Sequence, residues 1–190
     1  RLEYFRIARR NLESAIYKTD RFLIDACVEE ARHDKPFSAV RLLADIAASF
    51  QPYAERLGVT LISDTQGEPL LSCDHESLER VLCNLISNAI QNTPTGGTVH
   101  VAVVSENERA VFLVSDTGCG IDPKRVRDFL AGERAAGLGL SIISRLTKEI
   151  GGTIDCQSET GIGTSIAVRV PQESFSFDAQ GAPKNAAASV

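Results

Sequence analysis

Three short motifs in this sequence combine residue types that suit a phosphate- or nucleotide-binding site. The first places Asn84 and Asn88 four residues apart, the second is the Asp-x-Gly-x-Gly run 116–120, and the third is the Gly-Leu-Gly-Leu run 137–140. Neutral amide oxygens suit Mg²⁺, which takes a few protein oxygens together with water and phosphate. In this order along the chain, the motifs predict a pocket that binds a nucleotide with magnesium.

The paired asparagines belong to a predicted helix over residues 75–92, capped at its start by Asp74. Leucines recur along one face of this helix and predict its buried side. Polar residues recur every three or four positions on another face, namely Arg80, Asn84, Asn88 and Gln91. The alternative is a solvated polar face, and it is the two glycine motifs downstream that favour a binding role.

Asp116 ends an apolar strand pattern and begins the glycine loop. A carboxylate at this place can accept a hydrogen bond from an exocyclic amine such as that of adenine. Gly118 and Gly120 allow backbone conformations and close approaches that a Cβ would block. The alternative for the loop alone is an ordinary Asp-Gly turn.

The third motif opens a predicted helix over 139–150, with Gly137, Leu138 and Gly139 at its start. The free N–H groups and the dipole of a helix start favour phosphate. Further on, Thr164 enters the last strand from a Gly-x-Gly turn, and its hydroxyl is placed to reach a base. The alternatives are a flexible loop before a surface helix and a tight turn with a strand threonine.

The elements that position these motifs follow from hydrophobic periodicity and turn residues. A helix is predicted from the cap Ser38 to Leu57, and it ends at Gly58. The remaining predictions are a helix over 122–130 and strands over 59–62, 70–73, 98–104, 110–116, 153–157 and 164–170, with 98–116 forming a hairpin. Because helices and strands alternate without βαβ repetition, we expect an α+β two-layer sandwich with a mixed sheet covered by helices on one face.

The two ends of the chain differ from this central part. Residues 1–34 predict one long helix with a heptad stripe, which favours a helical-bundle interface in a dimer over packing on its own domain. Pro36 disfavours helix in the residue before it. The tail over 172–190 is rich in Ala, Ser, Gln and Gly and is predicted to be disordered.

Composition narrows the class of protein. The net charge of −5 argues against nucleic acid as the main partner. No apolar run approaches the roughly 18 residues of a membrane helix, and the five cysteines lack metal-like CxxC spacing, which favours reduced thiols. The chain contains no Met, which we interpret as a piece of a longer protein.

Together with the Gly-x-Gly-Thr strand, the three motifs resemble the ATP-binding domain of sensor histidine kinases in the GHKL ATPase superfamily. The resemblance covers about residues 36–171, so the implied domains are a second helix of the dimerisation and histidine-phosphotransfer hairpin over 1–34, an ATP-binding catalytic domain over 35–171 and the tail. It implies ATP and Mg²⁺ as cofactors, a response-regulator receiver domain as partner, a homodimer and a cytoplasmic location, which includes the cytosolic part of a membrane-bound receptor.

The resemblance also implies roles for single residues. Asn88 would be the magnesium ligand, with Asn84 supporting the phosphate side. Asp116 would contact the adenine amino group. The remaining ATP-binding positions are Gln91, Gly118, Gly120, Gly137, Leu138, Gly139 and Thr164.

The sequence departs from the family pattern where phosphate is bound. Members often carry Lys and an aromatic residue three and four positions after the second Asn, where this chain has Gln91 and Asn92. The lid before Gly137 is short, and Ala135 replaces its first glycine. The phosphoacceptor motif, a His followed by an acid, Leu, Arg, Thr and Pro, is absent, which places the acceptor histidine upstream of Arg1.

Two questions stay open in the sequence. Arg80, Arg125 and Arg134 are candidates for the missing cation, and nothing in the sequence chooses among them. The alternative function is a degenerate kinase-like module that regulates a partner by binding. An ATPase that hydrolyses ATP in a conformational cycle is disfavoured, because such enzymes usually carry Glu where Asn84 stands.

Overall fold

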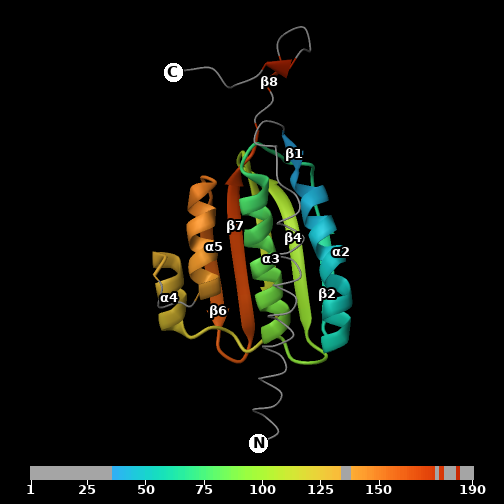
Figure 1. Ribbon diagram of the computed structural model, residues 1–190, viewed down its shortest axis with the longest axis vertical. Coiled ribbons are helices and arrows are strands. Elements are labelled where there is room, and N and C mark those ends of the chain that lie inside the picture. The colour runs from blue at the N-terminus through green and yellow to red at the C-terminus, as the bar shows by residue number, and fades with distance from the viewer. Residues whose placement is uncertain (1–35, 134–137, 174–175, 178–182, 185–190) are drawn as a thin grey trace, which may run out of the picture. The chain divides into compact units, whose positions relative to one another are not determined.

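The computed structural model describes residues 36–133, 138–173, 176–177 and 183–184 (Figure 1). The helix predicted over 1–34 lies outside these residues, as does Gly137. Among the described residues, no helix has both the length and the apolar character needed to cross a membrane.

A mixed sheet forms the centre of the fold. Within the described residues its five strands follow the order β2-β4-β5-β7-β6. Their bounds are β2 (Thr60–Thr65), β4 (Thr98–Glu106), β5 (Arg109–Asp116), β6 (Thr153–Glu159) and β7 (Gly163–Pro171). β2 and β4 run parallel, whereas the other neighbouring pairs in this sheet are antiparallel. The predicted mixed sheet and the hairpin formed by β4 and β5 are both present.

Helices cover one face of this sheet (Figure 1). They are α2 (Ala39–Leu57), α3 (His75–Asn92) and α5 (Leu138–Glu149), and the shorter α4 (Pro123–Ala131) packs beside β6. The α+β sandwich expected from the sequence is therefore the observed architecture.

The local signals that begin and end the helices act as predicted. The Ser38 hydroxyl accepts a hydrogen bond from the Arg41 N–H at 3.2 Å, and the Asp74 carboxylate accepts one from the Ser77 N–H at 3.1 Å. These caps satisfy backbone donors that the first turn of each helix leaves free. Gly58 ends α2 in the left-handed conformation, with φ of 69°.

The core lies between the helices and the sheet, and it becomes polar at one end. Leu78, Leu82 and Leu85 of α3 are buried as the stripe predicted. Because alternate strand residues share a face, the row of β5 that contains the buried Phe112 and Val114 ends at Asp116. Asp116 pairs with Thr164 of β7, so a carboxylate and a hydroxyl stand where the apolar rows stop.

The structure adds a small feature that the sequence did not predict. β1 (Phe37–Ser38) and β3 (Leu70–Leu71) pair antiparallel in a separate two-stranded sheet. Strands of two residues carry no periodicity, so Phe37 gave no strand signal and the strand predicted over 70–73 is shorter than expected.

The chain continues to contact this domain past the end of β7. The Gln172 N–H donates to the Glu108 carbonyl at 3.1 Å, and the Glu173 N–H donates to the Leu70 carbonyl at 2.8 Å. These two residues of the predicted tail are thus hydrogen-bonded to the domain. Beyond them, β8 (Ser176–Phe177) pairs with β9 (Pro183–Lys184), and the other tail residues lie outside the described part.

Candidate functional site

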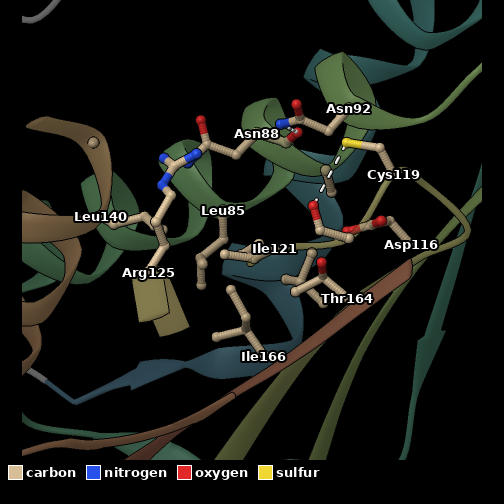
Figure 2. Close-up of a pocket in the computed structure, with 14 residues that line it drawn as sticks. Leu85, Asn88, Asn92, Asp116, Cys119, Ile121, Arg125, Leu140, Thr164 and Ile166 are labelled. Atoms are coloured by element: carbon tan, nitrogen blue, oxygen red, sulfur yellow. Dashed lines mark hydrogen bonds between the residues drawn. The ribbon is translucent and has the colours of Figure 1, made fainter. Parts of the chain in front are cut away.

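A cavity of about 280 Å³ lies between α3, α4, the start of α5 and the adjoining ends of β5 and β7 (Figure 2). Leu85, Val114 and Ile166 contribute to its apolar walls. Its polar side chains are Asn88, Asn92, Asp116, Cys119, Arg125 and Thr164. Pockets for small ligands usually enclose roughly 300–1,000 Å³, so this cavity is slightly smaller than that range and would enclose only part of a nucleotide.

Asp116 places a half-buried carboxylate in this cavity. Its Oδ1 accepts a hydrogen bond from the Gly118 N–H at 2.8 Å, and the Thr164 backbone N–H also donates to the carboxylate. Burial raises the pKa of Asp116 above its ordinary value, and the two hydrogen bonds oppose this rise only in part. The carboxylate is an acceptor in a largely apolar wall, which suits an amino group on a base.

Ser158 of β6 joins the glycine loop to the strands, a role that sequence reasoning missed. Its Oγ accepts a hydrogen bond from the Ile121 N–H at 2.7 Å and donates to the Gly163 carbonyl at 3.0 Å. A hydroxyl has one hydrogen, so Thr164, whose Oγ1 lies 2.9 Å from Ser158 Oγ, is the donor in that pair. The Thr164 oxygen is thereby left as an acceptor on the cavity wall.

The glycine loop after β5 is held from both sides by its backbone. The Cys119 N–H donates to the Asn92 carbonyl at 3.1 Å, and the Cys119 carbonyl accepts from the Gly161 N–H at 2.9 Å. Gly120 has φ of 70°, and a Cβ at this position would collide with the Glu159 carbonyl. The loop therefore requires glycine here for its conformation and for its close approach to the β6–β7 turn.

Asn88 and Arg125 line the cavity near the start of α5. Figure 2 shows the Asn88 amide and the Arg125 guanidinium pointing toward one another. A Cβ built on Gly139 would lie 3.6 Å from Asn88 Nδ2, so the first turn of α5 runs beside this amide. A helix start carries free N–H groups and a partial positive charge. An amide, a cation and a helix start thus meet at a place suited to an anionic group.

Many of the predicted site residues meet in this one cavity. Asn88, Asp116, Gly120, Gly139 and Thr164 all line it. They come from α3, α5, two strands and the loop, so residues up to 76 positions apart in the sequence form a single surface. The three motifs therefore contribute to one surface, and the binding roles of these residues stay predictions.

Other predicted residues lie elsewhere. Asn84 Nδ2 donates to the Arg80 carbonyl at 2.7 Å and Gln91 Nε2 donates to the Ser87 hydroxyl at 3.0 Å, and neither residue lines the cavity. Asn84 is one turn before Asn88, about 6 Å along the helix axis, so a shared face does not bring both to the site. Gly118 is buried within the loop and does not line the cavity, and a Cβ there would collide with the Asn92 carbonyl.

For two positions of the Gly-Leu-Gly-Leu motif, the structure does not give a side-chain environment. Gly137 lies outside the described residues, and so does the side chain of Leu138. Conversely, Asn92 lines the cavity and its Nδ2 donates to the Asn88 carbonyl at 2.7 Å. Asn92 was not among the site residues predicted from the sequence. The available signal was that Asn92 lies one helical turn after Asn88 and on the same face of α3.

The donor set fits magnesium only when phosphate accompanies it. Among the described residues, no group of three or more His, Cys, Asp or Glu side chains could hold a metal ion. Mg²⁺ is commonly bound by one or two protein oxygens plus water and substrate phosphates. Asn88, whose amide lies beside the start of α5, fits as one neutral oxygen ligand of such a site.

The cysteines near the site carry no metal-binding arrangement. The described cysteines are free thiols. Burial raises the pKa of the Cys156 thiol to about 11, with the charge of Asp116 adding to the rise, and burial likewise raises the pKa of Cys73 to about 11. Both are therefore protonated at neutral pH, whereas Cys119 is exposed at the edge of the cavity.

The sequence of this chain is similar to an ATPase family and to histidine kinases. The model of the family described as histidine kinase-, DNA gyrase B- and HSP90-like ATPase matches residues 73–174, more than half of the 190 residues. An uncharacterized sensor-like histidine kinase of Rhizobium meliloti (strain 1021) is 31% identical over 161 residues, which cover 77% of this chain and 31% of the relative. The circadian input-output histidine kinase CikA of Synechocystis sp. (strain ATCC 27184 / PCC 6803 / Kazusa) is 29% identical, over 77% of this chain and 22% of its own. The chain spans less than a third of the length of these relatives.

Solved structures share the same arrangement of strands and helices. Full-length ShkA in complex with AMPPNP is 29% identical, with a TM-score of 0.63 over 73% of this chain and 31% of that chain. The nucleotide-free catalytic domain of the histidine kinase ThkA is 22% identical, with a TM-score of 0.65 over 73% of this chain and 96% of that domain. The ThkA likeness shows a common fold across nearly the whole of that domain.

Proposed function

Because the chain belongs to the family of histidine kinase-, DNA gyrase B- and HSP90-like ATPases, we propose that it is the ATP-binding catalytic part of a two-component sensor histidine kinase. Its fold is the two-layer sandwich of the GHKL ATPase type. The γ-phosphoryl of Mg-ATP would pass to a histidine located outside this chain and then to an aspartate of a response-regulator receiver domain. The bond from the γ-phosphorus to the β,γ-bridging oxygen would break with ADP as the leaving group, and a phosphorus–nitrogen bond would form as the imidazole loses a proton.

The observation that carries this proposal is the polarity of the cavity. Asp116 and Thr164 offer hydrogen-bond acceptors at the end formed by the strands, between apolar walls that suit a base. Asn88, Gly139 and the start of α5 form the opposite, anion-binding side. A ligand with an amino-bearing base and a chain of phosphates matches both ends at once.

Each residue has a binding role in this proposal. Asp116 accepts from the exocyclic amine of adenine, and the oxygen of Thr164 is a second acceptor near the base. Asn88 supplies an oxygen to magnesium, while Gly139 lets the first turn of α5 approach the phosphates. When bound, Mg²⁺ offsets the negative charge of the phosphates, and the protein contributes chiefly positioning and charge stabilisation to the transfer.

The wider organisation is part of the same proposal. Residues 1–34 would form the second helix of the dimerisation and phosphotransfer hairpin, residues 35–171 the catalytic domain, and 172–190 a tail. Two chains would pair through the helical hairpin. The domain would act in the cytoplasm, either free or as the cytosolic part of a membrane-bound receptor, because ATP and receiver domains are found there.

The alternative is a degenerate module that regulates a partner by binding. One observation favours it: Gln91, at the position where the resembled family often has Lys, is neutral and donates to the Ser87 hydroxyl, and it does not line the cavity. The chain would then keep the fold of the kinase domain without catalysing phosphoryl transfer.

Two measurements separate these functions. Calorimetric titration of the chain with Mg-ATP and Mg-ADP should give binding, and absence of binding would contradict the ATP site itself. The full-length protein incubated with γ-labelled ATP should form an acid-labile, alkali-stable phosphohistidine that a receiver domain then removes. Nucleotide binding without phosphohistidine would favour the regulatory module.

A further inference from the structure

A site that binds phosphate is expected to carry a cationic side chain. The position where the resembled family often has Lys holds the neutral Gln91 in this chain. The chain has a net charge of −5, so its overall field does not attract a polyphosphate. Gln91 and Asn92 are both uncharged, and the side chain of Gln91 is engaged by Ser87. A cation must therefore come from another element that reaches the cavity.

Arg125 meets this requirement by its place in the fold. It lines the cavity from the first turn of α4, together with Asn88 and Gly139. In Figure 2 its guanidinium points toward the amide of Asn88, the proposed magnesium ligand. The cation therefore stands on the phosphate side of the cavity and not beside Asp116, the acceptor for the base.

The element that carries Arg125 is well fixed. The Asp122 carboxylate caps α4 by accepting from the Lys124 N–H at 2.8 Å, and Pro123 occupies the first turn. Phe129, one turn further on, is fully buried, and α4 packs against β6. The glycine loop leads directly into this helix. Asp116, which would bind the base, and Arg125 therefore lie on one continuous segment that is anchored to the domain.

The other candidate cations are less well placed. Among the described residues that line the cavity, Arg125 is the one with a cationic side chain. Arg80 is two turns before Asn88 and its Nη1 lies 3.9 Å from Glu76 Oε1, away from the cavity. Arg127 shares α4 but does not line the cavity, and Arg134 lies outside the described residues.

We propose that Arg125 binds a phosphate of the nucleotide and makes the site selective for nucleoside di- and triphosphates over nucleosides. The inference rests on the proposed ATP site. A guanidinium offers a planar pair of N–H donors that matches two phosphate oxygens, so it binds phosphate with direction as well as charge. In this chain α4 would thus supply the cation that, by the family resemblance, is expected on the helix of the paired asparagines.

The test compares nucleotides that differ in their phosphates. Arg125→Gln should weaken Mg-ADP binding about tenfold, which is the loss expected for one charge-assisted contact at an exposed side chain, while adenosine binding changes less than twofold. Arg125→Lys should retain part of the ADP affinity, since charge remains without the planar fork. Arg127→Gln, which removes the same charge from an exposed position two residues away, should bind both ligands like the wild type.

The outcomes separate the two proposals. If the wild-type chain binds neither adenosine nor Mg-ADP, the ATP site is wrong. If the wild type binds Mg-ADP and Arg125→Gln binds it equally well, the ATP site stands and the role of Arg125 is overturned. An equal loss of adenosine and ADP by a variant with an unchanged thermal midpoint would also overturn it, because Arg125 would then shape the pocket and not hold phosphate.

Discussion

At the scale of single residues, Asp116 shows how a binding group weakens the fold that carries it. Burial raises the pKa of this carboxyl, so the folded state holds its proton more tightly than the unfolded chain does. As pH rises from about 4, the ordinary value for Asp, the unfolded chain releases that proton first. The free energy of unfolding therefore falls through this pH range, and the loss remains at neutral pH.

Replacing Asp116 with Asn should weaken nucleotide binding without lowering the stability of the fold at neutral pH. Without nucleotide at pH 7, Asp116→Asn should have a thermal midpoint equal to or above that of the wild type, and this gap should close at low pH, where Asp116 is protonated. Binding of Mg-ADP should weaken roughly ten- to hundredfold, because a hydrogen bond to a charged acceptor contributes about 1.5–3 kcal/mol. Thermal melts over pH 3–8 and calorimetry measure both effects.

The matched control is Asp45→Asn, which neutralises an exposed carboxylate on α2. It should leave nucleotide affinity unchanged. An Asp116→Asn protein that melts lower at pH 7 yet retains the affinity would contradict the assigned role, since the carboxylate would then serve the fold and not the ligand.

At the scale of elements, strand β6 positions the glycine loop although it contributes no described lining residue to the cavity. The Ser158 hydroxyl bonds to the Ile121 N–H, the Gly163 carbonyl and the Thr164 hydroxyl. Loss of this group would leave several half-buried polar atoms without their partner. The loop that carries the proposed adenine contact would then lose one of its anchors.

Ser158→Ala should lower the free energy of unfolding by about 2 kcal/mol, since each buried polar group left unsatisfied costs roughly 1–3 kcal/mol. It should also weaken Mg-ADP binding several-fold. The control Ser115→Ala removes the hydroxyl that hydrogen-bonds to Ser165 on the opposite face of the sheet. Denaturant melts and calorimetry on both variants test this, and equal losses of nucleotide affinity would argue against a positioning role.

The elements also show what the sequence can predict. Caps such as Ser38 and Asp74 and the leucine stripe of α3 act locally, so their helices were predicted correctly. Contacts between distant strands carry no local signal, which is why the anchoring hydroxyl of Ser158 was missed. Helical spacing grouped Asn84 with Asn88 because it gives the face of a helix but not the distance along its axis to a cavity.

At the scale of the whole molecule, the order of the sheet couples the cavity to parts that do not touch it. The ends of β5 and β7 line the cavity, whereas β4 and α2 do not. Yet β4 pairs with β5 along eight residue pairs, and α2 packs on both α3 and β4. If these layers unfold as one cooperative unit, a ligand that binds only the folded state stabilises all of them equally.

Amide hydrogen exchange tests this coupling. At a free Mg-ADP concentration of 100 times its Kd, the folded state gains about 2.7 kcal/mol, so the slowest amides of β4 and α2 should exchange about a hundredfold more slowly, as should those of β5 and β7. At the same ADP concentration, Arg125→Gln should show only about a tenfold effect if its affinity is tenfold lower. Slowing confined to β5, β7 and α3 would contradict a single cooperative domain, because the ligand would then be closing the site locally without stabilising the sheet as a whole.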